Sequence, residues 1–435
     1  MRRNQFSRRM LLAGSGAAFA ARRAQALQRE PRVQIGKPWP IFGRAEEEAL
    51  LGVLRSGKWG RIEGSRVAEF ERQYRELLGV EHCVATANGT SALIAAMNAI
   101  DIGPGDEVLL PPYTFVATLN VILLQHALPV FVDSDRATFQ MDVRQLAARA
   151  TGQTRAVIQV HLGGATAGLD ASLKFCRDRG LRLVEDACQA HLGEWRGKKV
   201  GTLGDCGTFS FQASKNLNSG EGGALVTNDE DLFDRAYAFH GNGRARKITS
   251  ATLSGWASNG ANLRLTEFQG ALLLAQMSRL EAQSKTRETN AARLTAHLKQ
   301  IPGITPQVID EGCTRNAWHL YMFRYDPQAF AGLPRADFLK ELRAAGVAGS
   351  SGYTPLNREP FLEQVIESRH YRRIYGEARL RRWREENQCP QNDRLCGEAV
   401  WFTQTMLLGE PREMDFIAET IAGIQKRAAD LVRKA

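Results

Sequence analysis

The stretch at residues 206–228, CGTFSFQASKNLNSGEGGALVTN, has the composition of a β-hairpin with a polar, glycine-rich tip. Residues 209–211 and 224–227 are strand-like, and a run of glycines interrupts the chain between them. Lys215 lies between the two predicted strands. An amine held on such a loop is well placed to form a Schiff base with a carbonyl compound. A solvated loop lysine is the alternative that this stretch alone leaves open.

Strand-like and helical segments alternate upstream of this hairpin. The strand-like segments are residues 83–86, 107–110, 129–132, 156–160 and 181–184. The helical segments between them are residues 92–100, 117–125, 142–150 and 172–179. Strands that alternate with helices at this spacing predict a mostly parallel sheet covered on both faces.

The flanking segments differ from this alternation. A glycine-, proline- and tryptophan-rich region with one helical run, residues 45–56, precedes it. A polar segment at residues 241–260 and a long helix at residues 266–298 follow the hairpin. From residue 304 onward we expect one strand, residues 320–325, followed by helices and irregular arginine-rich segments. This change predicts a second, smaller α+β domain.

The composition is that of an ordinary globular protein of two or three domains. The chain has 435 residues, of which 43% are apolar and 24% charged, and its formal net charge is +10. Six arginines and no acid lie within residues 1–26, so the rest of the chain carries only +4. No cluster of aromatics among basic residues indicates a nucleic-acid surface. The seven cysteines form no C-x-x-C pair, and we expect reduced core cysteines and no metal site.

The first 26 residues resemble a twin-arginine export signal. The basic start contains SRRMLL at residues 7–12, and Ala24-Gln25-Ala26 forms an A-x-A cleavage pattern after the apolar run LLAGSGAAFA. This run is too short to span a bilayer as a helix, so we expect no membrane span. The resemblance predicts an exported, periplasmic protein. A basic tail on a cytoplasmic protein is the alternative.

Three features are expected at the carboxyl edge of the sheet, where open parallel sheets bind ligands. Gly89, Thr90 and Ser91 follow the first strand and open a helix, so they can form a phosphate site or a plain helix cap. Asp186 ends a buried strand, where it can pair with a cationic ring nitrogen or cap the next turn. Phe115 follows another strand and can stack on a flat ring or pack in the core.

These three features and Lys215 are the four parts needed to hold pyridoxal phosphate (PLP). The aldehyde bonds to the lysine, the pyridine nitrogen meets the aspartate, the ring stacks on the aromatic side chain, and the phosphate lies at the helix N-terminus. Each part is a weak signal alone, but together and in this order they predict a PLP site.

At these positions the chain resembles the DegT/DnrJ/EryC1/StrS aminotransferases, which are PLP enzymes of fold type I that aminate keto-sugars and related cyclitols. The resemblance spans about residues 35–430, and its form SFQASKNL is most similar to the glutamine:scyllo-inosose aminotransferases. The stretches that carry it are NGTSAL (88–93), PPYTFVAT (111–118), PVFVDSD (129–135), VEDACQAH (184–191), FSFQASKNLNSGEGGALVTND (209–229) and NLRLTEFQGAL (262–272).

The resemblance implies a domain arrangement. A large PLP-binding domain with a mostly parallel seven-stranded sheet between helices would occupy residues 27–300, after the signal at residues 1–26. Residues 35–64 would pack with the smaller C-terminal α+β domain, which would occupy residues 301–435.

The resemblance also implies a role for each matching residue. Lys215 would form the Schiff base and shuttle the proton between cofactor and substrate carbons, and Asp186 would meet the pyridine nitrogen. The other cofactor-binding positions would be Gln189 near the ring's 3-hydroxyl, Phe115 stacked on the ring, Gly89, Thr90, Ser91 and Ser210 around the phosphate, and Asn262. Because Asn262 would reach the phosphate of the neighbouring subunit, a homodimer with shared active sites is implied.

The leading hypothesis is an aminotransferase that moves an amino group from glutamate or glutamine to a keto-sugar or keto-cyclitol through the Lys215 Schiff base. A PLP-dependent sugar dehydratase is an alternative, but dehydratases of this family carry histidine at the position of Lys215. A non-catalytic regulatory protein on the same fold is a third, which the intact Lys215 and Asp186 disfavour. The loop YTPLN at residues 353–357 matches the family's substrate loop only loosely, and Arg264, His319 and Arg358 are further candidates for substrate contact.

Overall fold

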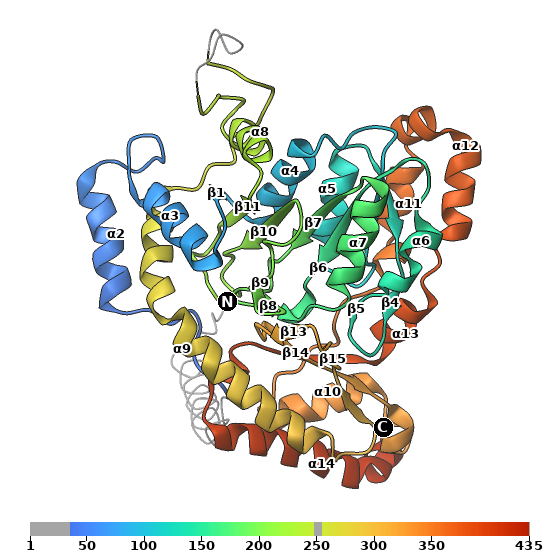
Figure 1. Cartoon of the computed structure of the whole chain (residues 1–435). Helices are drawn as coiled ribbons and strands as arrows, with labels where there is room; N and C mark the ends of the chain where they lie inside the picture. The colour runs from blue at the N-terminus through green and yellow to red at the C-terminus, as the bar shows by residue number, and fades with distance from the viewer. Residues whose placement is uncertain (1–34, 248–254, 435) are drawn as a thin grey trace, which may run out of the picture.

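The computed structural model of the chain describes residues 35–247 and 255–434 (Figure 1). The export signal expected at residues 1–26 therefore lies outside the described residues. Within the described part of the chain, no helix is both long enough and apolar enough to cross a bilayer.

A seven-stranded sheet forms the centre of the larger part of the molecule, with strand order β1-β11-β10-β7-β6-β2-β3. Only β11 runs antiparallel to its neighbours, β1 and β10. This arrangement confirms the predicted mostly parallel sheet, and β10 and β11 form the predicted hairpin. The strands are β1 (His82–Thr86), β2 (Glu107–Leu110), β3 (Leu128–Phe131), β6 (Thr154–Val160), β7 (Arg182–Asp186), β10 (Cys206–Ser210) and β11 (Gly223–Thr227).

Helices cover both faces of this sheet, because successive side chains of each strand point to opposite faces. In β2, Val108 and Leu110 pack in a core with residues of α4 and α5, whereas Leu109 packs in a second core with residues of α3, α7 and α9. The bounds of these helices are α3 (Arg66–Leu78), α4 (Gly89–Ala99), α5 (Val116–Leu124), α7 (Leu169–Arg179) and α9 (Glu267–Leu298).

A second, antiparallel sheet with its own core lies in the C-terminal region (Figure 1). Its strand order is β12 (Ile304–Pro306), β14 (Leu320–Tyr325) and β15 (Ala399–Thr403), and α10 (Arg335–Ala344) and α14 (Pro411–Lys434) pack beside it. The sequence predicted only β14. β12 is three residues long, and β15 follows a helix directly, so neither shows an extended alternating pattern.

The long helix α9 joins the two parts. Leu273 and Leu280 in its first half belong to a core of the seven-stranded sheet, and Leu294 and Leu298 belong to the C-terminal core. The N-terminal segment contacts both parts as well, since Gly36 N–H donates to Glu413 (2.7 Å) and α2 (Arg44–Ser56) packs on α9. The domain boundaries at residues 27–300 and 301–435 stay predictions.

Other local expectations need correction. The helix expected at residues 142–150 is a 3-10 turn at Val143–Gln145 followed by one turn of helix, α6 (Leu146–Arg149). The helices α3 and α8 (Glu230–His240) were not predicted, although α3 buries Val67, Phe70, Tyr74 and Leu78 at helical spacing. The arginine-rich segment forms α12 (Arg369–Glu386), which is a helix rather than an irregular segment.

Candidate active site

A pocket of about 580 Å³ lies at the carboxyl edge of the seven-stranded sheet. The ends of β7 and β10, the N-termini of α4 and α5, and the C-terminal region supply its walls. Seven of the nine predicted site residues line it: Gly89, Thr90, Phe115, Asp186, Gln189, Ser210 and Lys215. Ser91 and Asn262 are the two predicted residues that do not.

Lys215 lies on the loop of the β10–β11 hairpin, as predicted. Backbone hydrogen bonds hold this loop, from Phe211 N to Gly222 O (2.7 Å), from Ala213 N to Gly220 O (2.8 Å) and from Lys215 N to Gln212 O (2.8 Å). Burial lowers the pKa of the Lys215 amine, and the nearby Cys188 and Asp186 oppose this effect in part. Lys215 is half-buried and lines the pocket, which favours a Schiff-base lysine over a solvated loop lysine.

Asp186 is buried at the end of β7, with both carboxylate oxygens accepting hydrogen bonds. Thr118 Oγ1 donates to Oδ2 (2.9 Å), and the backbone N–H of Cys188 donates to Oδ1 (3.2 Å). No arginine, lysine or histidine of the described residues forms an ion pair with this carboxylate. A buried carboxylate without a cationic partner is costly, so it suits a protonated pyridine nitrogen.

The N-terminus of α4 forms the second wall of the site. Asn88 caps the helix, with its Oδ1 accepting from Ser91 N–H (2.8 Å), so the Ser91 amide is already occupied. The amides of Gly89 and Thr90 belong to the first turn, which has no intrahelical acceptors. A Cβ at Gly89 would lie 2.8 Å from Ser210 Cβ and 3.0 Å from Cys188 Sγ, so only glycine permits this close approach. Gly89, Thr90 and Ser210 therefore form a cradle that fits a phosphate group.

Phe115 and Gln189 face the pocket from two other elements. Phe115 precedes α5 and is 55% exposed, which is unusual for an aromatic side chain and fits one that stacks on a bound ring. Gln189 Oε1 accepts from Gly163 N–H (2.8 Å), and its Nε2 donates to Tyr353 Oη (3.1 Å). The buried carboxylate, the lysine, the cradle and the exposed ring together fit PLP.

Asn262 lies elsewhere on the same subunit. It pairs with Gly241 in an isolated β-bridge, next to a separate pocket of about 360 Å³ that Arg61, His240 and Arg264 line. Of the three further candidates for substrate contact, only His319 lines the large pocket. Arg358 forms an exposed ion pair with Asp393 (2.5 Å).

The sequence analysis missed several residues that line the pocket. Thr118 is one helical turn from Thr114, their hydroxyls are 3.0 Å apart, and this i,i+4 pair could have indicated a polar helix face. Trp401 comes from β15 and contacts the ring of Tyr353, with centroids 4.7 Å apart. No local signal marks Trp401, because tertiary packing brings it to the site.

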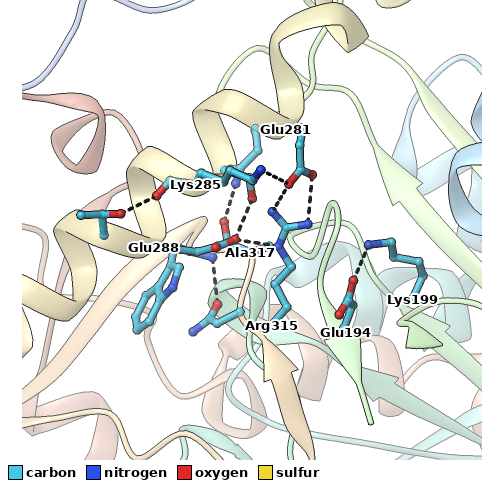
Figure 2. A network of polar contacts seen from close by, with 12 residues as sticks. Glu194, Lys199, Glu281, Lys285, Glu288, Arg315 and Ala317 are labelled. Atoms are coloured by element: carbon cyan, nitrogen blue, oxygen red, sulfur yellow. Dashed lines mark hydrogen bonds and ion pairs between the residues drawn. The ribbon is translucent and has the colours of Figure 1, made fainter. Parts of the chain in front are cut away.

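An ionic network anchors the segment that carries His319. Figure 2 shows Arg315 of β13 (Cys313–Arg315) pointing toward Glu281 and Glu288 of α9, with N–O distances of 2.9 and 2.6 Å. Two residues further on, Ala317 O accepts from Asn216 Nδ2 (2.7 Å), and Asn216 Oδ1 contacts His319 Nδ1 (3.2 Å). Since Asn216 follows Lys215, this network ties α9 to the lysine loop.

The chain as a whole is similar to known aminotransferases. A model of the DegT/DnrJ/EryC1/StrS aminotransferase family matches residues 40–374. L-glutamine:2-deoxy-scyllo-inosose aminotransferase of Streptoalloteichus tenebrarius is 35% identical over 421 residues, covering 91% of this chain and 96% of that protein. The spore coat polysaccharide biosynthesis protein SpsC of Bacillus subtilis is 37% identical over 333 residues, covering 75% of this chain and 84% of that protein. The crystal structure of 3-amino-5-hydroxybenzoic acid synthase matches with a TM-score of 0.80 at 32% identity, covering 90% of this chain and 99% of that one.

Proposed function

Because this chain belongs to the DegT/DnrJ/EryC1/StrS aminotransferase family, we propose that it moves an amino group from L-glutamine to the carbonyl carbon of a neutral keto-cyclitol, with Lys215 as the cofactor-bound lysine. The enzymes of this family depend on PLP. The observation that carries the proposal is that one pocket holds Lys215, Asp186 and the N-terminus of α4. The similarity to L-glutamine:2-deoxy-scyllo-inosose aminotransferase supports the choice of donor and acceptor.

The residues of the site would have separate roles in the proposed reaction. When bound, PLP supplies an aldehyde that accepts the amino group and a ring that withdraws electrons from the carbon to be deprotonated. Asp186 keeps the proton on the pyridine nitrogen, and the cradle around Gly89 holds the phosphate. Lys215 would hold the aldehyde covalently, and its amine, when free, would serve as the general base that moves the donor's α-proton. The reverse sequence with a ketone gives ping-pong kinetics.

The lining of the pocket favours a neutral polyhydroxylated acceptor over a nucleotide-linked sugar. Lys215 is the only lysine or arginine among the described residues that line it, and burial lowers the pKa of His319 well below its usual value. Gln212, Ser214 and Tyr353 offer polar groups to hydroxyls. A diphosphate would need cations, and the described residues that line the pocket supply none besides Lys215.

A half-reaction screen tests the proposal. We expect L-glutamine to bleach the absorbance band of the lysine-bound cofactor and a keto-inositol to restore it, while a nucleotide-linked keto-sugar restores it poorly. Lys215→Ala should lack the band, whereas Lys198→Ala, an exposed lysine of β9 (Lys198–Lys199), should keep it. A protein that shows no band after added PLP, or that no amino donor bleaches, would contradict the proposal.

We also propose that residues 1–26 direct export through the twin-arginine route, on the basis of the SRRMLL pattern and the A-x-A site. Replacing Arg8 and Arg9 with lysine should retain the protein in the cytoplasm. N-terminal sequencing of the mature protein should give a chain that starts after Ala26. A chain that begins at Met1 in the soluble cytoplasmic fraction would disprove export.

A further inference from the structure

Two backbone carbonyls directly before Lys215 are held by side chains from distant parts of the chain. Trp39 Nε1 donates to Ala213 O (2.7 Å), and Gln404 Nε2 donates to Ser214 O (3.4 Å). Trp39 belongs to the N-terminal segment, and Gln404 follows β15 in the C-terminal region. The loop that carries the reactive amine is thus held from outside the hairpin, at two consecutive residues.

Arg287 of α9 lies behind both of these side chains. Its Nε and Nη2 donate to Gln404 Oε1 at 3.0 and 2.7 Å, and its guanidinium carbon lies 5.6 Å from the centroid of the Trp39 ring. A guanidinium at this distance from an indole makes a favourable cation–π contact. Arg287 therefore fixes at once the two side chains that hold the lysine loop.

The burial of Arg287 is unusual. The residue is 0% exposed, its Nη1 has no hydrogen-bond partner among the described residues, and no carboxylate of those residues forms an ion pair with it. Removing a cation from water without a counter-charge is costly, so the fold tolerates this arrangement only with compensation elsewhere. Burial lowers the pKa of Arg287 to about 9, which leaves the guanidinium charged at neutral pH.

The charge of Arg287 reaches the surroundings of the lysine. After burial and the charge of Lys215, Arg287 contributes to lowering the pKa of His191 to about 4, and it also contributes to the lowered pKa of His319. The other titratable groups that face Lys215 are Asp186 and Cys188. Arg287 is thus a fixed positive charge that acts on His191 and His319.

We propose that Arg287 is a positioning residue for Lys215, which clamps the lysine loop through Trp39 and Gln404. This role rests on the proposed function, since it presumes that Lys215 carries the cofactor. Arg287 does not line the pocket, so it acts through its neighbours.

Three substitutions test the clamp. Trp39→Phe removes the hydrogen bond to Ala213 O but keeps a ring beside the guanidinium. Gln404→Glu keeps an oxygen acceptor for Arg287 but removes the Nε2 donor that holds Ser214 O. Arg287→Lys keeps the charge and loses the two-pronged contact with Gln404. Arg293→Lys is the matched control, because Arg293 lies on the same helix and forms a largely exposed ion pair with Asp415.

The test uses the full-length holoenzyme and two measurements besides activity. Amide hydrogen exchange of the peptide that contains residues 213–216 reports the clamp, and the pH midpoint of the lysine-bound cofactor band reports the burial of Lys215. We expect faster exchange, by about tenfold, in Trp39→Phe and Arg287→Lys. We expect faster exchange in Gln404→Glu as well, because a carboxylate cannot donate to Ser214 O. In all three variants the midpoint should rise, because a looser loop weakens the burial that lowers the pKa of Lys215.

The outcomes distinguish this role from the proposed function. If wild-type protein shows the band and all three variants match Arg293→Lys in exchange and midpoint, Arg287 has no positioning role. If the wild-type protein shows no band with PLP, the proposed function fails and this role fails with it. If Arg287→Lys does not fold, Trp39→Phe and Gln404→Glu still decide the question.

Discussion

The protein's own hydrogen bonds preorganise the carboxylate of Asp186. Two hydrogen bonds, from Thr118 Oγ1 and from Cys188 N–H, orient its carboxylate, and burial deprives it of water. These contacts occupy one lone pair on each oxygen and leave room for a third donor. The protein therefore holds the carboxylate in place, and in the proposed function a cationic ring nitrogen would be the third donor.

Replacing Asp186 with asparagine should slow the reaction much more than it weakens cofactor binding. The amide cannot hold the pyridine nitrogen protonated, so we expect kcat to fall on the order of 10²–10³-fold, as for removal of a single electrostatic stabiliser. The covalent bond to Lys215 should remain. Steady-state kinetics and the cofactor band measure the two effects. Asp178→Asn, which alters an exposed helical pair with Lys174, should leave both unchanged. Equal activity of the two variants would contradict this assignment.

The pKa of Lys215 predicts a pH dependence for cofactor capture. Burial lowers this pKa from the ordinary lysine value of 10.5, so the neutral, reactive amine is populated at a lower pH than in a free lysine. The rate at which cofactor-free protein regains the absorbance band should therefore rise with pH and level off below pH 10.5. A rate that still climbs through pH 10.5 would show an unperturbed lysine.

At the scale of elements, the N-terminus of α4 depends on a single close approach. Gly89 lies against Ser210 at the end of β10, and a methyl group there would approach Ser210 Cβ to 2.8 Å. The helix end and the strand end therefore form one cradle only because glycine separates them.

Gly89→Ala should weaken PLP binding by moving the helix end away from β10. We expect the dissociation constant to rise at least tenfold, about 1.4 kcal/mol, measured by equilibrium titration of the cofactor-free protein. Gly52→Ala in α2 is the matched control, since a Cβ at Gly52 meets nothing within 4 Å. Unchanged affinity in Gly89→Ala would show that the phosphate lies elsewhere.

Local sequence patterns predicted the elements with strong periodicity and missed those that tertiary packing defines. The strands of the parallel sheet are apolar because both faces are buried, so their runs stand out. β12 has only three residues and β15 follows a helix directly, so neither stands out in the sequence, and both pair with β14. The amphipathic pattern of α3 was present and overlooked.

The residues of the site fall into the same two groups, those that local patterns predict and those that packing brings to the pocket. Asp186 ends β7, and Gly89 and Lys215 lie in the segments that follow β1 and β10, so the strand pattern predicts that they meet at one edge. Tyr353 and Trp401 reach the pocket from the C-terminal region, where the chain returns to the sheet after more than a hundred residues. The resemblance pointed loosely to the loop that contains Tyr353, whereas only the assembled fold places Trp401 at the pocket.

At the scale of the whole molecule, the pocket lies where the seven-stranded sheet meets the C-terminal region. β7, β10 and α4 supply the cofactor-binding side, and His319, Tyr353 and Trp401 supply the opposite side. The long helix α9 contributes to both cores, and its residue Arg287 reaches the lysine loop. The position of the reactive amine therefore depends on how the two parts are joined.

We propose that two copies of the chain share each active site, because Asn262 lies outside the pocket of its own subunit and the resemblance implies a contact with the phosphate of the neighbouring subunit. Lys215→Ala and Asn262→Ala should each have little activity. Mixed and refolded together, they should regain up to about a quarter of wild-type activity per total site, since one mixed site in each heterodimer is intact. Asn259→Ala, an exposed residue nearby, mixed with Lys215→Ala should give only its own activity. No recovery beyond the separate variants would contradict shared sites.

The central claim is that Lys215 is the residue that binds the cofactor covalently. Reduction of the purified holoenzyme with borohydride fixes the cofactor to whichever lysine carries it, and peptide mass spectrometry then identifies that lysine. The account predicts the added mass on the peptide that contains Lys215, and no such modification in Lys215→Ala. Modification of another lysine in the wild-type protein, or of none after incubation with PLP, would contradict it.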